Sequence, residues 1–298
     1  MHIVILLIVV IAAITFLLMN KRKYVEPTDL SSLDLRDFKD AIAAPKAISE
    51  GQILAWSICF LENNPELDLA GITSFLQKKW GIASNTSSDD SSVQRVVTFG
   101  NVRLTFEPIL MKSGSLLPDQ LIPGGTTCVP EQQIGCILVT ASTPTGGAAA
   151  SLGLSQAILA LLATCRQVSG VYWMSSELIL KRSVAERKLT TNYKKFEWPV
   201  DVWISSHAFK DESGAVIGYT VGLGKIGGTD FEAVNAKESP KDLEDRLDGV
   251  ARYVVNHFGQ IQNGDTMGVD EKEKIRLKKT PSETIHRGWV FQLQYERS

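Results

Sequence analysis

The sequence has few of the residue patterns that usually identify an enzyme or a metalloprotein. Its four cysteines are Cys59, Cys128, Cys136 and Cys165, and their spacing matches neither a C-x-x-C pair nor a disulfide framework. None of its four histidines has zinc-ligand spacing to another histidine or to a cysteine. No G-x-S-x-G motif is present. We therefore expect no metal and no cofactor, name no catalytic residue, and favour a protein without catalytic activity.

An excess of basic charge is also missing. The chain has 31 Lys and Arg residues against 33 Asp and Glu residues, which gives a formal net charge of −2. Part of the basic charge is in short clusters, such as Lys181-Arg182 and Lys278-Lys279. Without a broad basic stripe, we expect no direct binding to nucleic acid.

A long apolar run is present near the start of the sequence. Residues 3–19 have Thr15 as their one polar side chain, and Lys21, Arg22 and Lys23 follow closely. As a helix the run would span about 26 Å, the short end of what crosses a bilayer core of about 30 Å. The cytoplasmic flanks of transmembrane helices are enriched in Lys and Arg. The pattern predicts a single-pass anchor in a bacterial inner membrane over residues 1–23, with the C-terminal body in the cytoplasm, rather than a buried core helix.

Beyond this run, the pattern of apolar residues predicts an α+β fold of mixed, largely antiparallel sheets with packed helices. Residues 24–50 are polar and read as a tether. An N-terminal α+β subdomain over 51–112 and a C-terminal α+β domain over 134–298 flank a Pro- and Gly-rich connection at 107–133. The predicted helices are 69–80, 148–167 and 240–258, and 83–92 is predicted to be a loop. The predicted strands are 53–61, 93–99, 102–106, 134–140, 168–174, 199–205, 216–221, 230–234, 274–278 and 289–295.

Two glycine-rich segments resemble ligand-binding loops. Gly222–Gly227 fits G-x-G-x-x-G after a predicted strand, but a dinucleotide site needs a helix to start within the motif. Residues 229–234 instead read as a strand, so we interpret the motif as a flexible strand connection. Thr143–Gly147 precedes the apolar helix and could be an anion nest. It lacks the lysine of a P-loop, and we favour a tight turn at the start of a buried helix.

Two groups of carboxylates are candidate sites. Asp230 and Glu232 are two residues apart on a predicted strand, where both would point to one face. With Asp265 they form a possible ligand site, although a solvated strand face is the favoured reading. The predicted helix 240–258 buries its apolar side and has an acidic outer side, which could bind the basic cleft of a protein partner. Its acidic residues are Asp242, Glu244, Asp245 and Asp248.

Several spaced motifs in the second half resemble a bacterial family of uncharacterised domains. They are VYW at 171–173, WPVDVW at 198–203, YTVGL at 219–223, GTDFE at 228–232 and NGDTMG at 263–268. The resemblance covers about residues 134–280 and implies an α+β domain of bacterial origin, without catalytic residues. The combination of a membrane anchor and a cytoplasmic α+β body is similar to immunity proteins against toxins delivered by type VI secretion.

These observations lead to one functional hypothesis and two alternatives. The first is a membrane-anchored cytoplasmic protein-binding module, in its specific form an immunity protein that neutralises a secreted bacterial toxin. The first alternative is an enzyme of unknown reaction with a site near the Gly222–Glu232 hairpin. The second alternative is a scaffold for an envelope complex.

Overall fold

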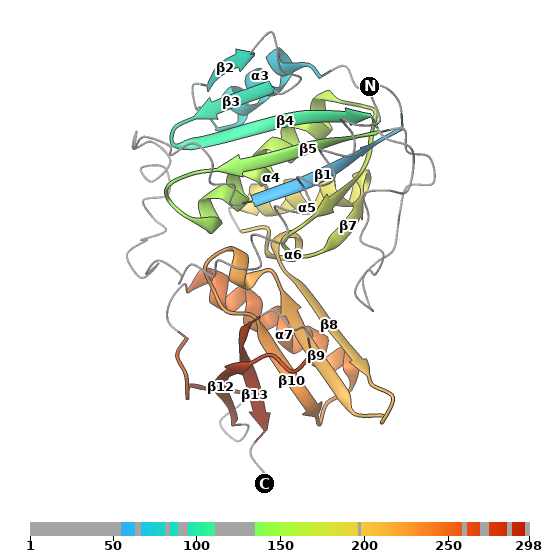
Figure 1. Ribbon diagram of the computed structural model, residues 1–298, viewed down its shortest axis with the longest axis vertical. Coiled ribbons are helices and arrows are strands. Elements are labelled where there is room, and N and C mark those ends of the chain that lie inside the picture. The colour runs from blue at the N-terminus through green and yellow to red at the C-terminus, as the bar shows by residue number, and fades with distance from the viewer. Residues whose placement is uncertain are drawn as a thin grey trace, which may run out of the picture.

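A computed structural model describes residues 55–62, 67–80, 84–88, 95–110, 135–195, 198–257, 261–268, 274–284 and 288–295. These residues form two sheets with packed helices (Figure 1). The strand order is β2-β3-β4-β5-β1-β6-β7 in a seven-stranded sheet and β11-β12-β13-β10-β9-β8 in a six-stranded sheet. The predicted α+β class is confirmed. The predicted anchor at 1–23, the tether and most of the connection between the two predicted domains lie outside the described residues.

The seven-stranded sheet is built from antiparallel neighbours. Its strands are β1 (Ala55–Leu61), β2 (Ser84–Ser88), β3 (Arg95–Phe99), β4 (Val102–Leu110), β5 (Gly135–Ser142), β6 (Val168–Trp173) and β7 (Leu178–Lys181). Three helices pack on it or on one another: α3 (Leu69–Trp80), α4 (Gly147–Thr164) and α5 (Arg182–Lys195). Successive side chains of a strand alternate between faces. Strand β1 has apolar residues on both faces and therefore contributes to two apolar clusters, Cys59 to one and Phe60 to the other.

Helix α4 lies at the centre of the apolar core. It contacts β1, β4 and β5 of the sheet as well as α3 and α5. By length and composition it is the one helix among the described residues that could cross a membrane, but it is mostly buried inside the protein. A helix that is apolar all round has to be covered on every side, so α4 is here a core helix.

The six-stranded sheet is mixed, because β10 pairs with β13 in parallel and its other neighbours are antiparallel. Its strands are β8 (Ser205–Lys210), β9 (Val216–Val221), β10 (Phe231–Ala236), β11 (Thr266–Met267), β12 (Ile275–Pro281) and β13 (Trp289–Tyr295). Helix α7 (Pro240–Asn256) packs on β8 and β9 through buried residues that include Leu243 and Leu247. The Ser239 hydroxyl accepts a hydrogen bond from the Asp242 N–H and caps the helix, and Pro240 lies in the first turn.

Most predicted elements are found within a few residues of their predicted bounds, but two predictions were wrong and some elements were not predicted. The predicted loop 83–92 contains β2, which pairs with β3 although its sequence SNTSS has no apolar pattern. The predicted strand 199–205 is a short helix, α6 (Val200–Trp203), and β8 begins only at Ser205. Strand β7 and helix α5 were not predicted. In the polar α5 sequence few side chains are buried, Ala185 and Leu189 among them, which left little periodic signal.

The two sheets share one buried apolar cluster, and their junction is at α4. A Cβ added to Gly147, the first residue of α4, would lie 2.1 Å from the carbonyl oxygen of Lys225, so only glycine fits there. Further along α4, the Ser155 hydroxyl accepts a 2.8 Å hydrogen bond from the indole Nε1 of Trp203. The two glycine-rich segments singled out in the sequence, 143–147 and 222–227, therefore pack against each other.

We predict that Gly147→Ala destabilises the protein by about 1–3 kcal/mol, because the new methyl group overpacks against the Lys225 backbone. Denaturant unfolding of the full chain measures this free energy. Gly249→Ala in α7 is the control, because its Cβ would meet nothing within 4 Å. That variant should be more stable by about 0.5–1 kcal/mol. Equal stability of Gly147→Ala and the wild type would contradict the junction described above.

Candidate functional site

The Asp230 carboxylate accepts hydrogen bonds from backbone N–H groups of the G-x-G-x-x-G loop. It accepts hydrogen bonds from the N–H of Leu223 at 3.0 Å and of Gly224 at 3.2 Å, and from the Thr220 hydroxyl at 3.1 Å. The loop contains a single 3-10 turn, η3 (Leu223–Lys225), and then leads to β10. No α-helix starts within residues 222–227, and the segment joins β9 to β10, so the interpretation as a strand connection is confirmed. The amides that would hold a phosphate in a nucleotide site here hold the protein's own carboxylate.

Gly222 is required at the start of this loop. Its φ is 125°, in the region that favours glycine, and an added Cβ would lie 2.2 Å from the carbonyl oxygen of Trp203. Burial raises the pKa of Asp230 to about 6, although the three hydrogen bonds from Gly224, Leu223 and Thr220 favour the charged form.

Glu232 is fully buried and holds the connection between β12 and β13. Its carboxylate accepts hydrogen bonds from the hydroxyls of Ser282 at 2.6 Å and Thr284 at 2.8 Å. The N–H groups of Glu283 at 3.0 Å and Thr284 at 3.3 Å also donate to it. The favoured reading of Glu232 as part of a solvated strand face was therefore wrong. Four donors satisfy a buried carboxylate that would otherwise be costly to bury.

Asp265 lies in an exposed turn before β11, apart from these two networks. Its carboxylate accepts a 2.7 Å hydrogen bond from the N–H of Gln262, and its carbonyl oxygen accepts one from the N–H of Leu277. Asp230, Glu232 and Asp265 thus bind three different segments of the chain. Within the described ranges, no group of three or more His, Cys, Asp and Glu side chains is placed to hold a metal ion.

A buried polar row that was not predicted crosses the six-stranded sheet. His207 on β8 pairs with Tyr219 on β9, which pairs with Glu232 on β10. The Ser205 hydroxyl donates to the carbonyl oxygen of Ser176, so it accepts the hydrogen bond from Nε2 of His207 at 2.8 Å. Ser205 and His207 therefore do not form a nucleophile and base pair.

Burial lowers the pKa of His207, against the charge of Asp248, and raises the pKa of Tyr219 to about 12. Both side chains are therefore neutral at neutral pH. The period-two spacing of Ser205 and His207 could have revealed this strand face, but the predicted strand ended at residue 205.

The acidic side of α7 faces outward, as predicted. Asp242, Asp245 and Asp248 are exposed, and Glu244 is half-buried. Two of these carboxylates have local partners: Asp242 accepts from the Ser239 hydroxyl at 2.6 Å, and Asp245 forms an ion pair with Lys241. These contacts lie along the helix surface and leave the acidic side accessible.

An aromatic pair continues this outer surface toward the end of α7. Tyr253 is 50% exposed and stacks on His257 with a ring centroid distance of 4.3 Å. Gly249 lies between the acidic residues and Tyr253 and is exposed. We call the exposed residues Asp242, Asp245, Asp248, Gly249 and Tyr253 the α7 face.

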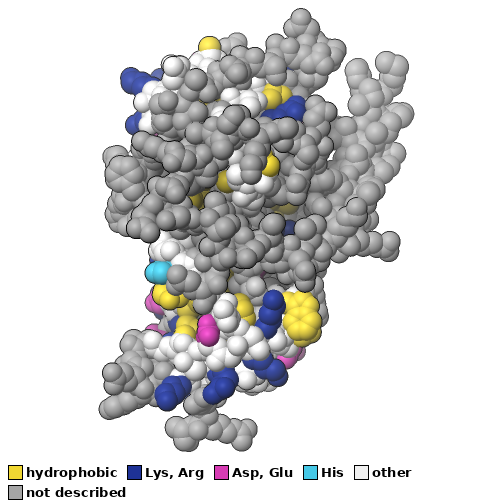
Figure 2. All heavy atoms as spheres, turned by 90° about the vertical axis from the view of Figure 1, so that its left-hand side faces the viewer, with side chains coloured by type: hydrophobic (Ala, Val, Ile, Leu, Met, Phe, Trp, Pro, Cys, Tyr) yellow, Lys and Arg dark blue, Asp and Glu magenta, His cyan; other side chains and the backbone are white. Residues whose placement is uncertain are grey.

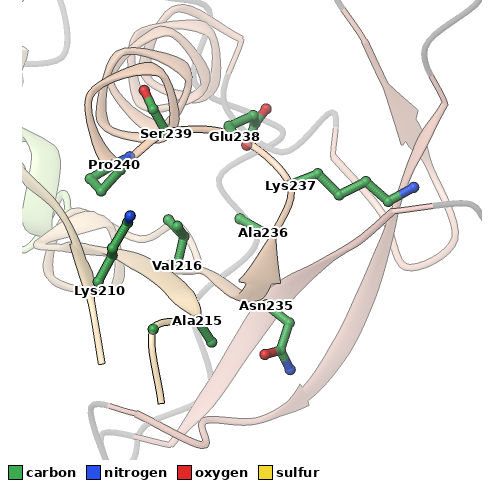
Figure 3. A pocket seen from close by; sticks show the side chains of 10 residues that line it. Lys210, Ala215, Val216, Asn235, Ala236, Lys237, Glu238, Ser239 and Pro240 are labelled. Carbon is green, nitrogen blue, oxygen red and sulfur yellow. The ribbon is translucent and has the colours of Figure 1, made fainter. Parts of the chain in front are cut away.

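A shallow, open depression lies beside the start of α7, at the ends of β8, β9 and β10 (Figure 3). Its volume is about 410 Å³, and it is lined by residues that include Lys210, Val216 and Asn235. The Glu238 carboxylate at its rim binds Arg246 and the Tyr295 hydroxyl instead of pointing into it. Polar groups do not converge in this depression, so it has few features of a ligand pocket.

Comparison with known proteins gives one match. Residues 219–293 match the family model described as Domain of unknown function (DUF4261). No curated protein and no solved structure matches the chain. The DUF4261 match runs from β9 into β13 and includes α7, Asp230 and Glu232. It supports the predicted uncharacterised domain in the C-terminal half, while the other sequence signatures and the similarity to immunity proteins stay predictions.

We predict that lowering the pH stabilises the wild type relative to Asp230→Asn. A carboxyl group with a pKa raised by folding favours the folded state when it is protonated, so this contribution is lost as the pH rises through about 6. The difference in unfolding free energy between the two proteins should therefore shift toward the wild type from about pH 7 to about pH 4. Urea unfolding at several pH values measures it, and a difference that does not change with pH would refute the prediction.

Proposed function

We propose that this chain is a membrane-anchored cytoplasmic protein-binding module, held in the membrane by residues 3–19, and that the α7 face contacts its partner. The observation that carries the proposal is the combination on one exposed helix surface of three carboxylates, a half-exposed tyrosine and a glycine. We further propose that the partner is a secreted bacterial toxin and that this chain is its immunity protein.

The exposed carboxylates of the α7 face outnumber the exposed cations Lys241 and Arg252 beside them, and this excess favours a basic partner. Exposed carboxylates attract and orient a positively charged surface and speed its association. A toxin that acts on nucleic acid has a basic cleft, and an acidic helix fits such a cleft. Tyr253 adds the residue type that most often dominates binding energy at protein interfaces, together with Trp and Arg.

Gly249 is a further reason to place the partner here. Glycine within a helix costs about 0.5–1 kcal/mol relative to alanine. The space around Gly249 is open, since an added Cβ would meet nothing within 4 Å. The fold therefore does not require glycine at this position, in contrast to Gly147. A partner that closely approaches the helix backbone would require it.

The enzyme alternative has less support. The carboxylates near the Gly222–Glu232 hairpin hold the loops at 220–224 and 282–284, which accounts for Asp230 and Glu232 without chemistry. The outer side of α7 has no comparable role in the fold. This contrast favours a surface for binding over a site for catalysis.

The test is whether co-expression of this chain protects cells against a toxic protein encoded by a neighbouring gene, together with capture of that protein by the full chain. Gly249→Arg should reduce the affinity by at least about tenfold, because the arginine fills the space that the partner needs. Asp245→Lys should have a similar effect through charge reversal, while the lost ion pair with Lys241 is exposed and contributes little to stability.

The matched control is Glu186→Lys, which makes the same charge change at an exposed position of α5. This variant should protect as well as the wild type. Absence of both protection and capture would reject the immunity function. Capture that is undiminished by Gly249→Arg and Asp245→Lys would instead reject the α7 face as the binding surface.

A further inference from the structure

The outer strand β12 carries a dense group of cations. Lys274, Arg276, Lys278 and Lys279 are all exposed, and no acidic residue is present between 274 and 281. Exposed acidic side chains nearby include Asp265 and Glu283, each of which accepts a hydrogen bond within the protein. Several Lys and Arg side chains gather on the lower part of the molecule in Figure 2, beside exposed hydrophobic ones. We call residues 274–281 together with Trp289 the β12 surface.

Trp289 is part of this surface and is 52% exposed. In the register of β12 and β13, Pro281 pairs with Trp289 and Lys279 pairs with Phe291. Trp289 and Lys279 are therefore diagonal neighbours on one face of the sheet, while Arg276 and Lys278 point to the opposite face, so the cations surround both sides of this end of the β12–β13 hairpin. Phe291 next to them packs on Phe231 in the core. Trp289 thus lies at the edge of the apolar core, next to exposed cationic side chains.

Protection of a sheet edge does not account for these residues. Lysines on an edge strand can prevent pairing with another chain, but segment 261–265 already covers this edge. The N–H and the carbonyl of Leu277 bond to Asp265 and Gly264, and the N–H of Lys279 bonds to the Asn263 side chain. A half-exposed tryptophan has no part in such protection either.

We propose that the β12 surface binds the anionic headgroups of the membrane in which the chain is anchored, a proposal that rests on the proposed anchoring by residues 3–19. Tryptophan is enriched at membrane interfaces, and lysines and arginines are attracted to the anionic cytoplasmic leaflet. The charge complementarity favours lipid phosphates. Residues 20–54, which separate the apolar run from β1, could reach roughly 100 Å when extended. This length is sufficient for the body to lie on the membrane.

The experiment uses the full chain with vesicles of phosphatidylcholine alone and with vesicles that also contain phosphatidylglycerol. Hydrogen exchange of the β12 and β13 amides should slow several-fold only on the anionic vesicles, and salt should weaken the effect. Lys278→Glu with Lys279→Glu should abolish the slowing, and Trp289→Gln should reduce it. Lys78→Glu with Lys181→Glu, the same charge change at exposed positions of α3 and β7, should leave it intact.

The possible outcomes separate the two proposals. Flotation with phosphatidylcholine vesicles tests the anchor. If the chain does not float with them, the anchor proposal fails, and flotation with anionic vesicles then tests the β12 surface alone. Equal exchange on both vesicle types, or no effect of the lysine replacements, would overturn the lipid proposal. Slowing by duplex DNA but not by anionic vesicles would assign the surface to nucleic acid instead.

Discussion

The structure depends on the burial of most of α4. An 18-residue helix with an apolar surface on all sides cannot be covered by one sheet alone. The seven-stranded sheet, α3 and α5 cover part of it, and the second half of the chain supplies Trp203 and the loop 222–227 for the rest. The close approach of Gly147 to the Lys225 backbone and the bond from Trp203 to Ser155 then place the six-stranded sheet. One apolar cluster extends through both halves as a result.

This constraint also separates residues that serve the fold from residues available for function. The glycine-rich loop contacts α4 and is held by Asp230, and Glu232 holds the connection between β12 and β13. Asp230 and Glu232, which the sequence indicated as a possible ligand site, are therefore hydrogen-bonded to other parts of the fold. The charged side chains of the outer side of α7 and of the β12 surface are exposed, and these charges and the half-exposed aromatic residues beside them have no comparable role in the fold. Both proposals of function follow from this difference.

Elements with a regular apolar pattern could be predicted from the sequence alone. Elements and side-chain environments that depend on tertiary contacts could not. The helical spacing of apolar residues such as Leu243, Leu247 and Val250 was enough to predict α7. Strand β2 has no apolar residue and exists through backbone pairing with β3, so no pattern could reveal it. The acidic side of α7 was predictable from helical spacing, but the burial of Glu232 was not, because its four donors come from residues 282–284, some fifty positions away.

The most direct test of this account is native-state hydrogen exchange of the full chain in increasing denaturant. It compares the amides of α4 with those of β10. If α4 requires cover from both halves, the two elements should exchange through the same global opening and give the same free energy of unfolding. Exchange of β10 through a smaller opening, while α4 stays protected, would contradict the claim that one core around α4 joins the two sheets.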